Sequence, residues 1–478
     1  MGIVKSVTDK SSESKFPTLS DLRATLNTAL PLGIGYLGWM LISLTDSIML
    51  GRLGPEALSA AGLALSIYNI IAMLGWGLLF PVIVFVSRVC GAGRPRRRIA
   101  LLVVRQGLWI AGILSIPGCI ILWNTTHILM LAGQDPILAG MAGQYMDYHL
   151  WTLLPVLTTF AFTMAFTAMD RTRTIALIIW LEVGLNILLN YVLIFGNLGF
   201  PAMGLAGAGL ASIIVYGAGH MAFFMIFGFH RFFRSFAVFK RAWKPSGNIL
   251  GRSVSLGWPK SLDASIITIP FSIFALLAGW FGVQAITAYT ITWQIALMIS
   301  HTLSSATADT VTVGVSAALA RKSHARMYRA LYSSILILLI LLSPLIGIFW
   351  AFPEWIVTLF IGSEVPNARE FMPLASSLTV LVGFFLIADG FRVVCGQALN
   401  GLSDMKMPAL IALLTYWGGG ISFGMLLGFA MDLGVQGFWI GLTFGMSFTS
   451  VCYLMRFRWL VRELYRKSSG VGPHPIDP

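Results

Sequence analysis

Apolar residues run along this chain in long stretches that are separated by short polar segments. Many stretches extend over about 20 to 25 residues, the length a helix needs to cross the hydrocarbon core of a bilayer. Strands of a membrane barrel would instead alternate apolar and polar residues over about 10 positions. The pattern predicts twelve transmembrane helices, at residues 27–50, 57–86, 101–123, 145–168, 174–196, 203–228, 257–280, 285–318, 330–352, 372–398, 408–430 and 435–455. The predicted fold class is therefore an all-α integral membrane protein.

Composition excludes the main alternatives. Of the 478 residues, 57% are hydrophobic and only 11% are charged. A soluble domain carries about 25% charged residues, and a disordered chain needs low hydrophobicity. Neither class fits.

The positions of the basic residues test the number of helices. The chain has 32 lysines and arginines, and cytoplasmic loops of membrane proteins are enriched in them. With the N-terminus in the cytoplasm, Arg52 and Arg369 lie on the outer side and Arg392 lies within a span. All the others fall in cytoplasmic segments or their flanks. This bias predicts that both termini are cytoplasmic, and it attributes the net charge of +13 to loops that face anionic lipid rather than to nucleic-acid binding.

The two halves of the chain repeat each other. Pro31 corresponds to Pro259, and residues 51–54 correspond to residues 279–282 at the same offset. Each half holds six spans, so the two repeats enter the membrane in the same sense and are related by an axis along its normal. The expected organisation is an N-terminal segment (1–26), an N-lobe (27–228), a linker (229–256), a C-lobe (257–455) and a cytoplasmic tail (456–478).

Charged residues inside the spans are candidate functional residues, because each one costs at least about 2.5–3.5 kcal/mol in the membrane. They are Asp46, Glu182, Asp263, Asp309, Asp389 and Arg392. Asn186 and Asn190 are four residues apart and share a helix face. With Asp46 they could form a polar cluster that binds a proton or a substrate cation. The alternative is that these amides only join helices by hydrogen bonds.

Three segments carry a resemblance to a known family: LTDSIMLGRLGPEALSAAG, LNILLNYVLIFGNLGFPAMGLAGAGLAS and ADGFRVVCGQALNGLSDMKMP. They resemble the multidrug and toxic compound extrusion (MATE) family, specifically its bacterial NorM-type branch. The resemblance implies two homologous six-helix bundles around a central V-shaped cavity, and antiport of a solute against protons or sodium. It places Asp46 at the acidic position of the N-lobe and Asp389 at that of the C-lobe. Some members carry an aspartate where this chain has Asn190.

The remaining charged residues are Arg392 and three weaker candidates, Asp263, Glu182 and Asp309. Arg392 lies three residues after Asp389, so the pair forms either a transport site or a neutral structural ion pair. Asp263 is a second candidate partner for Arg392. Glu182 lies one turn before Asn186, and Asp309 lies towards the cytoplasmic end of its span.

The resemblance also bears on the coupling ion. It implies a cation site with a glutamate in the seventh span, but that position is occupied here by Ile267. Sodium prefers several oxygen ligands, whereas a proton needs one carboxylate. We therefore expect proton coupling through Asp46 or Asp389. Sodium coupling is the alternative, because Asp263, four residues before Ile267, could partly replace the missing glutamate.

Two other functions are possible. A lipid-linked oligosaccharide flippase of related fold would need a strongly basic cavity, whereas these spans hold five acids and only Arg392. An enzyme or scaffold has no support, because the chain lacks motifs such as HExxH and GxSxG. The expected partners are a small-molecule substrate, a coupling ion and the bilayer of the cell's inner (plasma) membrane. We expect a monomer, without cofactor or metal.

Overall fold

The fold is described by a computed structural model for residues 14–92, 97–229, 245–361 and 368–468. These residues are almost entirely helical and form no strand. The first half contains α1 (Leu19–Leu53), α2 (Pro55–Leu79), α3 (Pro81–Gly91), α4 (Arg97–Trp123), α5 (Thr125–Leu131), α6 (Pro136–His149), α7 (Leu153–Ala168), α8 (Thr172–Phe195) and α9 (Gly204–Phe229). The second half contains α11 (Gly247–Ala278), α12 (Val283–Ile299), α13 (Ser305–Ala320), α14 (His324–Ala351), α15 (Pro353–Ile361), α16 (Ala368–Gly401), α17 (Lys406–Ala412), α18 (Ser422–Met425) and α19 (Gly434–Ser468).

The twelve predicted spans are all present. Eleven helical segments are long and apolar enough to cross a membrane. The twelfth, predicted at residues 285–318, is a helical path from α12 to α13 that a π-helical turn at Ser300–Ser304 interrupts. The pieces on either side have 17 and 16 residues, so neither crosses the bilayer alone.

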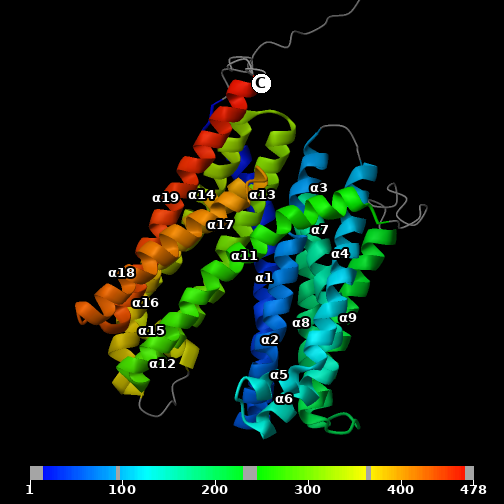
Figure 1. Cartoon of the computed structure of the whole chain (residues 1–478), viewed down its shortest axis with the longest axis vertical. Coiled ribbons are helices and arrows are strands. Elements are labelled where there is room, and N and C mark those ends of the chain that lie inside the picture. The colour runs from blue at the N-terminus through cyan, green and yellow to red at the C-terminus, as the bar shows by residue number, and fades with distance from the viewer. Residues whose placement is uncertain (1–13, 93–96, 230–244, 362–367, 469–478) are drawn as a thin grey trace, which may run out of the picture.

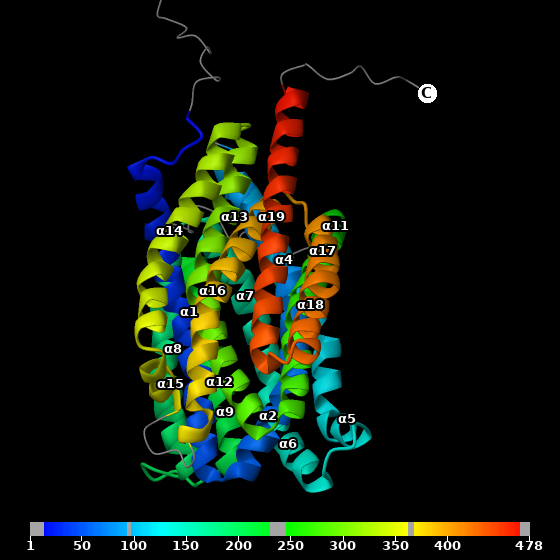
Figure 2. The ribbon, with the colours of Figure 1, turned by 90° about the vertical axis from the view of Figure 1, so that its left-hand side faces the viewer.

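The helices form two bundles. One large apolar core is built almost entirely from α1–α9, which we call the N-lobe, and two others are built from α11–α19, the C-lobe. The bundles lie together at the top of Figure 1 and spread apart towards the bottom. In Figure 2, the C-lobe helices α14, α16 and α19 lie in front of the N-lobe helices α4, α7 and α8.

Helix α11 joins the two lobes. It begins at Gly247, well before the predicted start of its span at residue 257, and it runs diagonally from the C-lobe to α2 of the N-lobe (Figure 1). The hydroxyl of Ser261 donates a hydrogen bond to the carbonyl of Leu74 at 2.8 Å. A Cβ at Gly257 would lie 2.6 Å from the carbonyl oxygen of Leu78, so α11 and α2 are in backbone contact there.

A second contact between the lobes lies at the upper end of Figure 1, where α3 packs against α13. A Cβ on Gly91 would lie 2.5 Å from the Cα of Ala317, so only glycine allows this approach. Arg321 donates to the carbonyl of Gly91 at 2.7 Å, and Arg88 donates to the carbonyl of Gly401 at 3.2 Å. The last carbonyls of a helix have no partner within it, so each arginine satisfies a helix end of the opposite lobe.

Candidate functional site

The N-lobe contains a polar cluster between α1 and α8. One carboxylate oxygen of Asp46 accepts hydrogen bonds from the side-chain amides of Asn186, at 2.8 Å, and Asn190, at 2.6 Å. The two asparagines are 1% and 0% exposed, and they come from successive turns of α8. The structure therefore brings together the three residues that the sequence groups into one cluster.

The cluster has unused hydrogen-bonding capacity. The amide oxygens of Asn186 and Asn190 are buried and have no hydrogen-bond partner in the described part of the chain. Tyr145 of α6 and Tyr216 of α9 lie close enough to interact electrostatically with Asp46. A ligand that donates hydrogen bonds, or carries positive charge, would find acceptors on three side chains.

Glu182 lies beside this cluster rather than in it. It is buried one turn before Asn186, and the side chain of Trp39 on α1 lies next to its carboxylate. The side chain of Tyr216 interacts electrostatically with both Glu182 and Asp46. Glu182 is thus a neighbour of the cluster, and no hydrogen bond joins it to Asp46 among the described residues.

In the C-lobe, Asp389 forms an ion pair with Arg392. The guanidinium contacts one carboxylate oxygen at 2.6 Å and 3.1 Å, and the hydroxyl of Ser300 donates to the other at 2.5 Å. Ser300 belongs to the π-helical turn that interrupts the eighth span. π-helical turns occur frequently at functional sites, and this one provides the third donor to Asp389.

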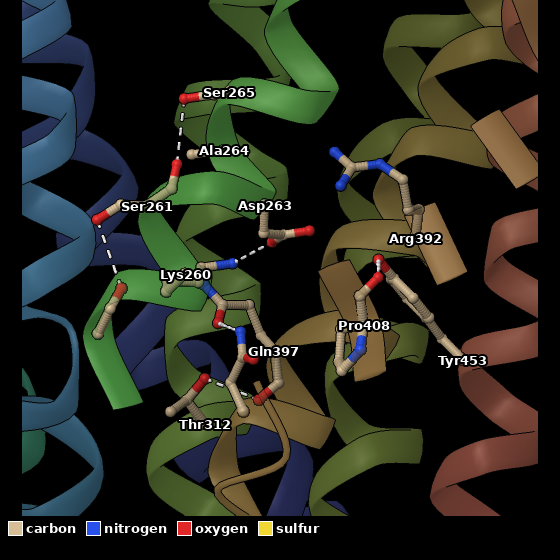
Figure 3. Close-up of polar contacts among 12 residues, drawn as sticks. Lys260, Ser261, Asp263, Ala264, Ser265, Thr312, Arg392, Gln397, Pro408 and Tyr453 are labelled. Carbon is tan, nitrogen blue, oxygen red and sulfur yellow. Dashed lines mark hydrogen bonds and ion pairs between the residues drawn. The ribbon is translucent and has the colours of Figure 1, made fainter. Parts of the chain in front are cut away.

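Asp263, the second candidate partner of Arg392, forms no ion pair with it among the described residues. Asp263 forms its ion pair with Lys260, at 2.8 Å on the same helix, although Arg392 still interacts with it electrostatically. Figure 3 shows Asp263 between the two basic side chains. The second carboxylate oxygen of Asp263 has no hydrogen bond within the described residues.

Lys260 itself is the residue that sequence reasoning missed, because it was grouped with the cytoplasmic flank. Its side chain is only 10% exposed, and its ammonium lies 5.5 Å from the ring of Phe80 and 5.8 Å from that of Trp76. The spacing of three residues to Asp263 was the available indication. Lys260 and Arg392 are therefore two buried bases of the C-lobe spans, and Arg105 of α4, 6% exposed, is another in the N-lobe.

Two further positions differ from the sequence interpretation or sharpen it. Asp309 lies in the second turn of α13, in the later part of the predicted span, and Tyr36 of α1 donates a hydrogen bond to it across the lobe boundary. Ile267 packs against the C-lobe core and offers no ligand atom. Among the described residues, no group of three or more His, Cys, Asp and Glu could hold a metal ion.

Comparison with known proteins gives a consistent result. The MatE family model matches the chain twice, at residues 31–192 and 259–426. A "probable multidrug resistance protein NorM" of Mesorhizobium japonicum is 34% identical over 93% of this chain and 94% of its own length. The protein of the same name in Pseudomonas aeruginosa is 30% identical, over 95% and 92%. A solved outward-facing MATE-family multidrug resistance transporter has the same fold, with a TM-score of 0.81 at 20% identity, covering 96% of this chain and 99% of its own.

Proposed function

The chain belongs to the MatE family, and from this premise we propose that it is a secondary antiporter that exports small molecules in exchange for protons. The names of its relatives support multidrug efflux, with amphipathic and often cationic substrates. The protein would act as a monomer in the inner membrane with both termini in the cytoplasm. The two lobes would alternately open to each side of the membrane.

The observation that carries this proposal is the environment of Asp46. Its carboxylate is held by two neutral amides, from Asn186 and Asn190, and forms no ion pair within the described residues. A single carboxylate can bind either a proton or an organic cation, and binding of one displaces the other. This competition is what an exporter needs to couple proton entry to substrate release.

The C-lobe supports protons over sodium as the coupling ion. Asp389 is paired with Arg392, Asp263 is paired with Lys260, and Ile267 replaces the expected glutamate. Sodium would have to compete with two cations that are covalently attached to the protein. A proton needs only one carboxylate, which Asp46 provides.

A flippase for lipid-linked oligosaccharides fits less well. Lys260 adds a buried base beside Arg392 in the C-lobe, but each of the two is neutralised by its own aspartate. No positive charge is left over in this part of the C-lobe to bind a pyrophosphate, while Asp46 presents an unpaired acid.

The experiment is transport of ethidium, a flat aromatic cation, in liposomes that contain the purified protein. A pH gradient and a sodium gradient are imposed separately. We expect exchange to follow the pH gradient and to persist without sodium. Exchange driven by sodium at fixed pH, and unaffected when the proton gradient is collapsed, would falsify proton coupling.

A further inference from the structure

We infer that Asp309, Tyr36 and Thr163 form a second proton-exchange site, located at the boundary between the two lobes. This inference rests on the proposed function, because it adds a site to a proton-coupled cycle. At this site the carboxylate of Asp309 would exchange its proton through a water molecule that contacts both lobes.

The first observation is a hydrogen bond between the lobes. The hydroxyl of Tyr36, on α1, donates to one carboxylate oxygen of Asp309, on α13, at 2.5 Å. The other oxygen accepts a longer bond of 3.4 Å from the amide of Gln397, which Asn400 holds in place at 2.8 Å. The shortest bond to Asp309 therefore comes from the opposite lobe.

The second observation is a small cavity beside this bond, whose mostly apolar wall includes a few polar side chains. Its volume is about 20 Å³, and Asp309, Tyr36, Thr163 and Thr167 contribute polar groups to its wall, with Trp39 and Phe160 among the aromatic ones. A cavity of this size holds about one water molecule. Water remains in such a cavity only if it finds polar partners there.

Thr163 provides the missing partner. Its residue is 4% exposed, and its hydroxyl is buried without a hydrogen-bond partner in the described part of the chain. Buried hydroxyls are almost always hydrogen-bonded, so an unpartnered hydroxyl in the wall of a cavity that a carboxylate also lines indicates a bound water. That water would contact Thr163 of the N-lobe and the carboxylate of the C-lobe.

Few charged groups surround Asp309. Among the described residues, the titratable groups that interact with it are Tyr36 of α1 and Lys260 of α11. The neighbouring helices α7 and α16 contribute the neutral side chains of Thr163 and Gln397. Lys260 is already bound to Asp263, so Asp309 forms no ion pair within the described chain.

These features couple proton binding to the movement of the lobes. If the lobes separated where α1 meets α13, the hydrogen bond from Tyr36 would break and bulk water would reach Asp309. The proton affinity of the carboxyl would then differ between the two arrangements. Each transition would therefore take up or release protons at Asp309, in addition to those exchanged at Asp46.

The test counts the protons exchanged when the full-length protein in lipid nanodiscs binds ethidium. Calorimetry in two buffers of different ionisation enthalpy gives this number across a range of pH. We expect Asp309→Asn to lower it by up to about one proton and to change ethidium affinity less than threefold. As a matched control, Asp432→Asn changes an exposed carboxyl in a left-handed turn, where asparagine is well tolerated, and should leave the number unchanged.

Two milder variants keep the test decisive if Asp309→Asn does not fold. Tyr36→Phe and Thr163→Val each remove one hydroxyl at nearly constant shape. Each should shift the pH dependence of proton exchange by about 0.3 to 1 unit, the effect of one hydrogen bond. A normal proton count and pH profile in all three variants overturns this inference and leaves the proposed function standing. A wild-type protein that exchanges no protons overturns the proposed function, and this inference with it.

Discussion

The main carboxylates of the two lobes have different surroundings, although the lobes repeat each other. Asp46 in the N-lobe is held by two neutral amides, whereas Asp389 in the C-lobe is bound by the guanidinium of Arg392. Asp46 accepts two hydrogen bonds and Asp389 three, but of the two only Asp389 has a basic partner among the described residues. A carboxylate without a counter-ion can exchange cations with solvent, while a paired one must first lose its partner.

The difference suggests a division of labour between the lobes. The repeated helices place an acid in each lobe, and the neighbouring residues then decide its chemistry. In the C-lobe, Lys260 and Arg392 each neutralise a buried aspartate three residues away on their own helix. We therefore expect mutations in the C-lobe network to affect stability first, and mutations around Asp46 to affect transport first.

The largest expected effect is on stability, in the C-lobe. Arg392→Met should destabilise the protein by about 3–5 kcal/mol, because it leaves the charge of Asp389 buried without its partner. Removing both charges, in Asp389→Leu with Arg392→Met, should recover most of that loss. Unfolding of the detergent-solubilised protein measures both. If the single and double variants were equally unstable, the unpaired charge of Asp389 would not be the cause of the loss of stability.

The second prediction concerns the N-lobe. Asp46→Asn keeps the size of the side chain but removes the group that titrates, so ethidium exchange should fall at least about a hundredfold. Its stability should change by no more than about 1 kcal/mol, since no ion pair is broken. Asp432→Asn again serves as the matched control. Normal exchange by a well-folded Asp46→Asn protein would show that Asp46 takes no part in transport. The proposed difference in role between the two lobes would then be wrong.

The third prediction alters how the lobes meet. In Gly91→Val the new side chain would overlap α13, since even a Cβ would lie 2.5 Å from the Cα of Ala317. Overpacking costs about 1–3 kcal/mol, so the arrangement seen here should lose about 5- to 150-fold in population. Spin labels on the two lobes at this end should report longer distances. Unchanged distances would show that α3 and α13 do not limit closure.

The sequence predicted the twelve helices because long apolar runs and the placement of arginines and lysines are both local properties. It also placed Asp46 near Asn186 and Asn190, since a four-residue spacing puts two side chains on one face and a polar face in a membrane needs a partner. The π-helical turn at Ser300–Ser304 was not predicted, although its sequence SHTLS is polar, because the apolar helical pattern continues on both sides of it.

Contacts between the lobes were beyond the sequence for a physical reason. Tyr36 and Asp309 are far apart in the chain, and their meeting depends on how two bundles pack. Lys260 was misplaced because it lies only a few residues after the basic linker, residues 229–256, and was therefore assigned to the cytoplasmic flank of the span. Only the direction of α11 across the lobe boundary shows that this lysine is buried against Trp76 and Phe80.

The smallest expected effects come from deleting one hydrogen-bond donor in each lobe, and they measure the contrast most directly. Ser300→Ala removes one donor from Asp389, which keeps both contacts to Arg392. It should cost about 0.5–1.5 kcal/mol of stability and change ethidium exchange less than twofold. Asn186→Ala removes half of the donors to Asp46, so it should cost a similar amount of stability but shift the pH dependence of exchange by about 0.3 to 1 unit. If Ser300→Ala shifted the pH dependence as much as Asn186→Ala does, the paired carboxylate of the C-lobe would also exchange protons during transport, and the two lobes would share the coupling.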